Sequence, residues 1–242
     1  MLEASEACLT YPNGVEALKD INIFMDQGEF VFLMGTTGSG KSSLLKLFYR
    51  DEVPTSGEVY VNNHDITELP RNRIYMLRRK VGVVFQDFKL LDYKTVRENV
   101  SYALEVTGYQ PKKIAEKVDM VLDIVGLMDK KDRYPDELSG GEKQLTSIAR
   151  ALVYNPPVLL ADEPTGNLDS VSADNVMKIL EYINSKGTTV VVATHNQEIV
   201  KKMNKRVITL KKGKIISDEG GANPDMEIQG KKITPSNKMD LR

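Results

Sequence analysis

The sequence is poor in cysteine, tryptophan and histidine, because its 242 residues include one cysteine, no tryptophan and two histidines. A single cysteine, Cys8, excludes an internal disulfide framework and a cysteine-rich metal site. The two histidines, His64 and His195, stand too far apart in the sequence to indicate a zinc site. No apolar run approaches the roughly 20 residues of a membrane-spanning helix, and no charged-then-apolar leader opens the chain. We therefore expect a cytoplasmic protein that reaches a membrane only through a partner.

The sequence also lacks an excess of positive or negative residues. Lys and Arg number 33 and Asp and Glu 34, which gives a formal net charge of −1. A domain that binds nucleic acid generally carries a strongly basic surface, so this balance argues against a nucleic-acid partner. The length suits one large domain or two small ones.

Apolar patterning divides the chain into three parts. Up to about Phe85 it reads as short strands and turns, its middle is helical, and its last third alternates strands with helices. This alternation predicts an α/β protein with a largely parallel, buried sheet that ends in a hairpin. The expected helices cover residues 42–49, 112–127, 143–154 and 173–184, and the expected later strands 80–85, 158–162, 188–193, 206–210 and 214–218.

Residues 35–42 match the pattern G-x-x-x-x-G-K-[ST] and lie between an apolar run and a helical segment. In this context the backbone N–H groups and the following helix bind phosphate oxygens. Lys41 is expected to reach the β- and γ-phosphates, and the Ser42 hydroxyl to coordinate Mg²⁺. The alternative is a flexible turn, which does not explain the flanking strand and helix. The expected nucleotide-binding residues of this phosphate loop are Gly35, Thr36, Thr37, Gly38, Ser39, Gly40, Lys41 and Ser42.

Polar residues follow three of the expected strands. Asp162 and Glu163 end an apolar strand, where Asp162 would hold Mg²⁺ and Glu163 would polarise the attacking water. Gln86 would sense the metal and the water, and His195 would touch the γ-phosphate. Taken singly, each has a plainer interpretation: a solvated acidic turn, a surface amide and a structural histidine.

A second phosphate-binding feature is indicated at Ser139-Gly140-Gly141-Glu142. Ser139 and Glu142 form a capping box in front of an amphipathic helix. Capping does not explain two glycines, each of which costs up to about 1 kcal/mol against alanine in a helix. A phosphate close to the backbone would explain them. Because the chain already has a phosphate loop, we expect two chains to share one nucleotide.

With these motifs in this order and spacing, the sequence resembles the ATP-binding cassette (ABC) ATPase family over nearly all of residues 1–220. The resemblance implies a P-loop NTPase fold, with a mostly parallel core sheet, an N-terminal antiparallel β subdomain and an inserted helical subdomain at about 88–156. Residues 221–242 would form a polar tail. It also implies an ATP hydrolase with ATP and Mg²⁺ as cofactors.

The resemblance further implies a homodimer that forms on ATP binding and encloses two nucleotides. Ser139, Gly140 and Gly141 of one copy would face the phosphate loop of the other, and Asp169, also acting in trans, would support the dimer seam. Tyr11 would stack on adenine. The catalytic residues would be Lys41, Glu163 and His195, and the metal ligands Ser42, Gln86 and Asp162.

Within the family, residues 82–91 and 162–169 resemble the cell-division branch. That branch implies a polytopic membrane partner of the FtsX type and control of cell-wall hydrolysis, at the inner face of the membrane. The second segment is shared with lipoprotein-release and macrolide-export ATPases, so an export pump remains an alternative, as does a slow ATP-dependent assembly or signalling module. Lys143 and Leu145 depart from the Gln-Gln-Arg that usually follows the capping box.

Overall fold

The computed structural model describes residues 1–220, and the predicted tail at 221–242 lies outside the described residues. These residues form two sheets and seven α-helices. The strands are β1 (Leu2–Thr10), β2 (Glu16–Met25), β3 (Phe30–Met34), β4 (Ser56–Val61), β5 (His64–Asp65), β6 (Val81–Val84), β7 (Val158–Asp162), β8 (Thr189–Thr194), β9 (Arg206–Lys211) and β10 (Lys214–Glu219). The helices are α1 (Lys41–Phe48), α2 (Ile74–Lys80), α3 (Val96–Glu105), α4 (Pro111–Ile124), α5 (Gly140–Leu152), α6 (Ser170–Ser185) and α7 (Gln197–Met203).

The larger sheet has the order β10-β9-β3-β8-β7-β6. All its neighbouring strands pair in parallel except β9 and β10, which form the expected antiparallel hairpin. The smaller sheet is antiparallel, with the order β2-β1-β4-β5. The predicted fold class, a mostly parallel core sheet with an N-terminal antiparallel β unit, is therefore confirmed.

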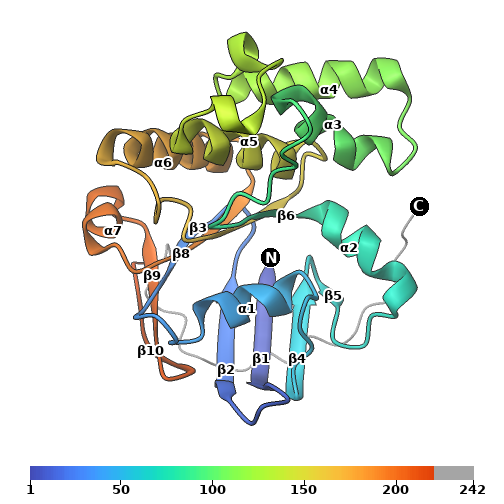
Figure 1. Cartoon of the computed structure of the whole chain (residues 1–242). Helices are drawn as coiled ribbons and strands as arrows, with labels where there is room; N and C mark the ends of the chain where they lie inside the picture. The colour runs from blue at the N-terminus through green and yellow to red at the C-terminus, as the bar shows by residue number, and fades with distance from the viewer. Residues whose placement is uncertain (221–242) are drawn as a thin grey trace.

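Both faces of the parallel sheet are buried, which explains the continuous apolar runs in the sequence. Along β3, Val31 and Leu33 pack with α1 and the antiparallel sheet, whereas Phe30 and Phe32 pack with α3 to α6. Figure 1 shows this layering, with α1 between the two sheets and α3, α4, α5 and α6 beyond the parallel one. Because both faces of the sheet are covered, ligands can reach the ends of its strands but not its faces.

Helices α3, α4 and α5 pack on one another and share one apolar cluster with the sheet face below them. The helical subdomain bounds of 88–156 stay a prediction. No helix within residues 1–220 has the length and apolar character that crossing a membrane requires.

Three expectations for local structure were wrong. The first part of the chain contains long strands, of 9 and 10 residues for β1 and β2, and also α2. Helices α2 and α7 have only seven residues each and bury one residue each, Leu77 and Val200, so each is too short for a repeated apolar spacing that would reveal a helix in sequence. Lys80, expected to begin a strand, ends α2 instead.

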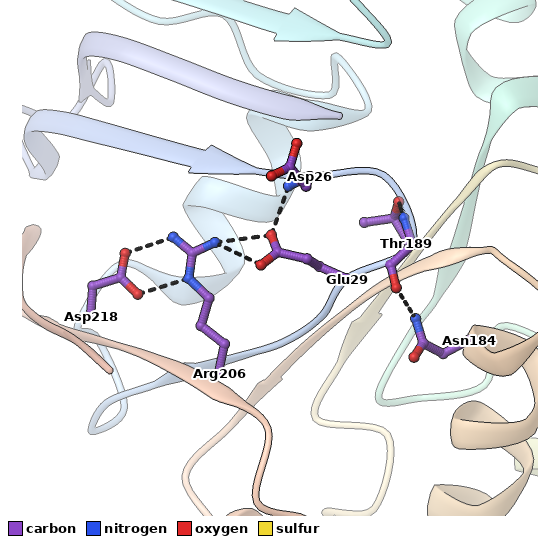
Figure 2. A network of polar contacts seen from close by, with 7 residues as sticks. Asp26, Glu29, Asn184, Thr189, Arg206 and Asp218 are labelled. Atoms are coloured by element: carbon purple, nitrogen blue, oxygen red, sulfur yellow. Dashed lines mark hydrogen bonds and ion pairs between the residues drawn. The ribbon is translucent and has the colours of Figure 1, made fainter. Parts of the chain in front are cut away.

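A polar network joins the end of the larger sheet to the turn before β3. The guanidinium of Arg206 on β9 bonds both carboxylate oxygens of Glu29, at 3.2 and 2.9 Å, and both of Asp218 on β10. Figure 2 shows Arg206 between these two carboxylates, with Glu29 also accepting from the backbone of Asp26. The side chains of Arg206 and Glu29 are only 16% and 19% exposed, so the pair is largely shielded from water.

Arg206→Ala is predicted to lower the free energy of unfolding by about 1–3 kcal/mol, because it leaves the shielded Glu29 carboxylate without its charged donor. The measurement is urea unfolding at neutral pH. The matched control is Lys202→Ala, which breaks an exposed ion pair with Asp174 and should leave the transition unchanged. Equal urea midpoints for Arg206→Ala and the wild type would contradict a stabilising role for the network.

Candidate functional site

The phosphate loop, residues 35–42, leaves the end of β3 and runs into the first turn of α1, as predicted. Gly35 has φ +152°, and a Cβ there would lie 2.4 Å from the carbonyl oxygen of Leu210. Gly40, at the start of α1, has φ +110°, and a Cβ there would lie 2.8 Å from the carbonyl oxygen of Ala17. Only glycine fits both positions, because each combines an unusual backbone angle with a close backbone neighbour.

The loop is also supported from outside. The amide of Gly213, in the turn of the β9–β10 hairpin, donates to the carbonyl of Ser39 at 3.0 Å, and the Gly213 carbonyl accepts from the amide of Lys19 at 2.8 Å. Sequence analysis missed this role of Gly213. A glycine in a lysine-rich turn signals a hairpin, but it carries no sign of the distant loop that it holds.

Lys41 has a buried side chain that is folded against its own loop. Its Nζ donates to the carbonyls of Gly35 at 2.8 Å and Thr36 at 3.3 Å, and lies 3.6 Å from Glu163 Oε1. Only 7% of the Lys41 side chain is exposed. In the described residues the ammonium is therefore surrounded by oxygen atoms of the loop and of Glu163, and its contact with phosphate remains a prediction.

Glu163 lies between Lys41 and His195. Its amide donates to the carbonyl of Ala193 at 2.8 Å, which ties it to the neighbouring strand. Its φ of +44° is strained for a residue with a side chain, and such strain is retained mainly at functional sites. Oε1 accepts from His195 Nδ1 at 2.9 Å. Since a carboxylate can only accept, Nδ1 carries the hydrogen, and in the neutral ring Nε2 remains an acceptor.

The three residues predicted to be catalytic, Lys41, Glu163 and His195, are therefore brought together at the ends of β3, β7 and β8. Glu163 Oε2 is buried and has no hydrogen-bond partner within residues 1–220. His195 is 62% exposed, in keeping with a group that meets a ligand from solvent. Their catalytic roles remain predictions.

Asp162, beside Glu163, offers a site for a cation. Burial raises the pKa of its carboxyl, and the nearby Ser42 side chain opposes this rise; the Glu163 carboxylate raises the pKa further, and the charge of Lys41 lowers it. Its Oδ1 is buried and has no hydrogen-bond partner in the described part of the chain. A buried, unpaired carboxylate oxygen next to a hydroxyl is the oxygen chemistry that Mg²⁺ prefers.

Gln86 and Tyr11 lie at the edge of this group. Gln86 follows β6, is exposed, and its carbonyl lies 3.5 Å from Asn167 Nδ2 in the loop after β7. Within residues 1–220, no hydrogen bond joins the Gln86 side chain to Asp162 or Lys41. The hydroxyl of Tyr11 lies 3.1 Å from Ser43 Oγ on α1, so its ring stands beside the phosphate loop, and its role in stacking remains a prediction.

The predicted capping box at the start of α5 is present. Glu142 N donates to Ser139 Oγ at 3.3 Å, and Ser139 N donates to Glu142 Oε2 at 2.8 Å. The other carboxylate oxygen of Glu142 pairs with Lys130, and this hydrogen bond is the largest cause that lowers the pKa of Glu142. Ser139 and Gly140 are exposed.

The expectation that a bound phosphate explains both glycines at this helix start is wrong for Gly141. A Cβ at Gly141 would lie 2.8 Å from Ser172 Oγ on α6, so close packing of the two helices already accounts for this glycine. Gly140 has no such conflict, since a Cβ there would lie 3.4 Å from the Leu168 side chain and 3.8 Å from the carbonyl oxygen of Asn167. Packing therefore leaves only Gly140 as a glycine that a bound phosphate would explain.

Asp169 is the N-cap of α6. Its Oδ1 accepts from the amides of Val171 and Ser172 at 3.0 Å each, and its Oδ2 accepts from Ser172 Oγ at 2.6 Å. The hydrogen bond from the Ser172 hydroxyl is the main cause that lowers the pKa of Asp169. Because Gly141 packs on Ser172, the starts of α5 and α6 lie side by side.

The predicted site residues thus form two groups. One gathers around the phosphate loop, and the other, Ser139 to Gly141 with Asp169, lies at the paired starts of α5 and α6. In the part of the chain that the structure describes, no hydrogen bond or ion pair joins Ser139 to the phosphate loop. Each group is exposed on one side, so neither surrounds a triphosphate by itself.

Leu145, one of the departures from the usual family pattern, is buried in the apolar cluster shared by α3 to α6. An arginine at this position would have to reach out of that cluster, so Leu145 contributes packing in place of a surface charge.

Comparison with known proteins identifies the family. The ABC transporter profile matches residues 18–166. Curated relatives named "Cell division ATP-binding protein FtsE" include those of Bacillus subtilis (53% identity, covering 90% of this chain and 96% of the relative), Mycobacterium tuberculosis (51%, 84% and 88%) and Escherichia coli (41%, 88% and 96%).

Solved structures agree with this assignment. The ATP-binding cassette MJ0796, in a dimeric post-hydrolysis state bound to ADP and Pi, has a TM-score of 0.83 and 36% identity, and covers 91% of this chain and 98% of that one. CbiO1 from Clostridium perfringens, part of the ABC transporter complex cbiONQ, has a TM-score of 0.84 and 33% identity, with coverages of 90% and 88%. The chain therefore belongs to the ABC transporter family, and it is an ATP-binding ATP hydrolase of the ABC type.

Proposed function

We propose that this protein is a Mg²⁺-dependent ATPase that dimerises around ATP and drives a polytopic membrane protein in cell division. The observation that carries the proposal is the contact of Glu163 with both Lys41 and His195, at the edge where β3, β7 and β8 end. These groups are a cation for phosphate, a carboxylate for the attacking water and an imidazole, which are the parts that phosphoryl transfer to water needs.

Ser42, Gln86 and Asp162 are the proposed ligands of Mg²⁺. The unpaired Oδ1 of Asp162 and the adjacent Ser42 side chain support this assignment. When bound with ATP, the ion would neutralise phosphate charge. Oε1 of Glu163 is engaged by His195, and the buried Oε2, which has no hydrogen-bond partner within residues 1–220, would orient the water molecule.

The second group of residues supports a dimer. Ser139 and Gly140 offer an exposed, capped helix start whose N–H groups and dipole favour an anion. Within residues 1–220, no hydrogen bond or ion pair joins it to the phosphate loop of its own chain. The dimeric form of the MJ0796 cassette is in keeping with a second copy as the source of the missing contact.

The names of the curated relatives favour a role in cell division over lipoprotein release or macrolide export. We infer that the partner is a polytopic permease-like protein of the FtsX type. The ATPase would then lie at the inner face of the membrane through that partner and transmit movement that controls cell-wall hydrolysis.

Glu163→Gln is predicted to lower ATP turnover at least about 100-fold, because it removes the base while it retains the shape of the side chain. ATP binding should persist, and a nucleotide-bound dimer should accumulate. Turnover is measured by phosphate release, and binding by equilibrium dialysis. Glu116→Gln, an exposed glutamate on α4, is the control and should retain wild-type turnover. Unchanged hydrolysis in Glu163→Gln would overturn the catalytic assignment.

Ser139→Asp is predicted to abolish ATP-dependent dimerisation in the Glu163→Gln background. Aspartate still caps α5, but it places a negative charge against the partner's phosphates. Thr95→Asp is the matched control, because Thr95 caps α3 through the same capping box with Glu98. Sedimentation with ATP and Mg²⁺ should give monomers for the first variant and dimers for the second. An ATP-dependent dimer of Ser139→Asp would refute contact in trans.

Purification of the tagged protein from native membranes is predicted to recover a division-type membrane protein. Recovery of a pump-type permease in its place would favour export and reverse the proposal.

The decay of bound ATP in a single turnover, with and without the partner, separates a driven ATPase from a slow assembly module. If the recovered partner does not accelerate this decay, the protein is a slow assembly module.

A further inference from the structure

The start of α5, which the proposed function assigns to the phosphates of a second copy, carries a negative charge of its own. Its first turn presents the amides of Gly140 and Gly141, which have no hydrogen-bond acceptor within residues 1–220. The carboxylate of Glu142 lies in the same turn, with Oε2 2.8 Å from the amide of Ser139. A phosphate at the glycine amides would lie within the Debye length of about 8 Å at physiological salt, so a Glu142 charge without compensation would repel it.

Lys130 compensates this charge. It ends the short 3-10 turn Met128–Lys130, and its ammonium donates to Oε1 of Glu142. Both carboxylate oxygens are thereby engaged, one by the Ser139 amide and one by Lys130. The hydrogen bond between the two side chains is the largest cause that lowers the pKa of Glu142 and raises the pKa of Lys130. Both groups are therefore charged at neutral pH, and their charges cancel beside the helix start.

Capping alone does not require such a lysine. Helix α3 begins with the same capping box, formed by Thr95 and Glu98. Within residues 1–220, however, Glu98 forms no ion pair. The lysine thus accompanies the capping box that is assigned to a phosphate and not the one that only caps a helix.

The surroundings of the pair offer no other compensation within residues 1–220. Lys130 and Glu142 line a surface hollow of about 390 Å³ beside α4, α5 and α6, and its other charged lining residues are Asp123 and Asp129. Without Lys130 the lining would hold three carboxylates and no cation. Arg133 is near enough to affect the charge of Lys130, but it pairs with a different carboxylate. Lys130 is therefore the cation of this hollow that balances Glu142.

We propose that Lys130 is a positioning residue that neutralises and orients Glu142, so that the start of α5 accepts the phosphates of a nucleotide held by a second copy of this chain. Lys130 holds Oε1 and leaves Oε2 to the Ser139 amide, which keeps the carboxylate in its capping position. The side chains of Lys130 and Glu142 are 39% and 22% exposed, so water screens the pair only in part. The inference rests on the proposed function, which places the start of α5 against the partner's phosphate loop.

The test is a charge series at this pair, made in the Glu163→Gln background. The measured quantity is the ATP concentration that gives half-maximal dimer in sedimentation, at one protein concentration and with excess Mg²⁺. Lys130→Met leaves Glu142 uncompensated and should raise this concentration about 3- to 30-fold. Glu142→Gln keeps the capping hydrogen bond and leaves Lys130 as a net positive charge, so it should lower the concentration. The two substitutions together restore the net charge of the original pair and should give a concentration within about two-fold of the parent protein.

Two controls separate charge compensation from general damage. Lys130→Arg keeps the positive charge and should stay near the parent value. Lys205→Met removes a lysine of similar exposure, paired with Glu181 on α6, and should leave dimer formation unchanged. The increase caused by Lys130→Met should also shrink when salt is raised from about 0.05 to about 0.5 M, because salt screens a charge effect and does not repair a packing defect.

A double variant that remains as impaired as Lys130→Met would overturn the proposal, because the uncompensated charge of Glu142 would then not be the cause. Unchanged dimer formation in Lys130→Met would overturn it as well. Failure of the proposed function has a different signature, which is a Glu163→Gln protein with Lys130 and Glu142 intact that forms no dimer with ATP.

Discussion

The parallel register of β3, β8 and β7 is the constraint on which the rest of the structure depends. Met34 pairs with Thr194, and Asp162 pairs with Ala193, so the three strands end at one level. Packing on both sheet faces maintains this register, because a shift by one residue would exchange side chains between two layers with different neighbours. The residues that follow these strands, including Glu163, therefore lie at the same edge without any direct link in sequence.

A few ionisable side chains share their contacts at that edge of the sheet. Lys41 is shared between loop carbonyls and Glu163, and Glu163 is shared between Lys41 and His195. Since burial raises the pKa of the adjacent Asp162, the cluster favours binding of further positive charge beside the carboxylates. Such a cluster is prepared for an anionic ligand that arrives with a cation, and it explains why Lys41 and the acidic pair occur together.

Local patterns were enough to predict the phosphate loop, the acidic pair and the capping box, because each motif creates its geometry within a few residues. Contacts between distant segments were not predictable in this way. Gly141 is required by the closeness of Ser172, Gly213 donates to Ser39, and Arg150 donates to the carbonyls of Lys89 and Phe88, which lie 61 and 62 residues earlier in the chain. A single sequence records the residue types at these places but not their neighbours, which only the packing of α5 on its surroundings brings into contact.

The central claim is that each nucleotide site combines the phosphate loop of one copy with Ser139 of another. Complementation tests it most directly: Lys41→Ala and Ser139→Asp chains, each inactive alone, are mixed and assayed for ATP hydrolysis. A mixed dimer contains one site with an intact Lys41 from one chain and an intact Ser139 from the other, so activity should reappear. If mixed dimers form and remain inactive, each site belongs to a single chain and the claim is contradicted.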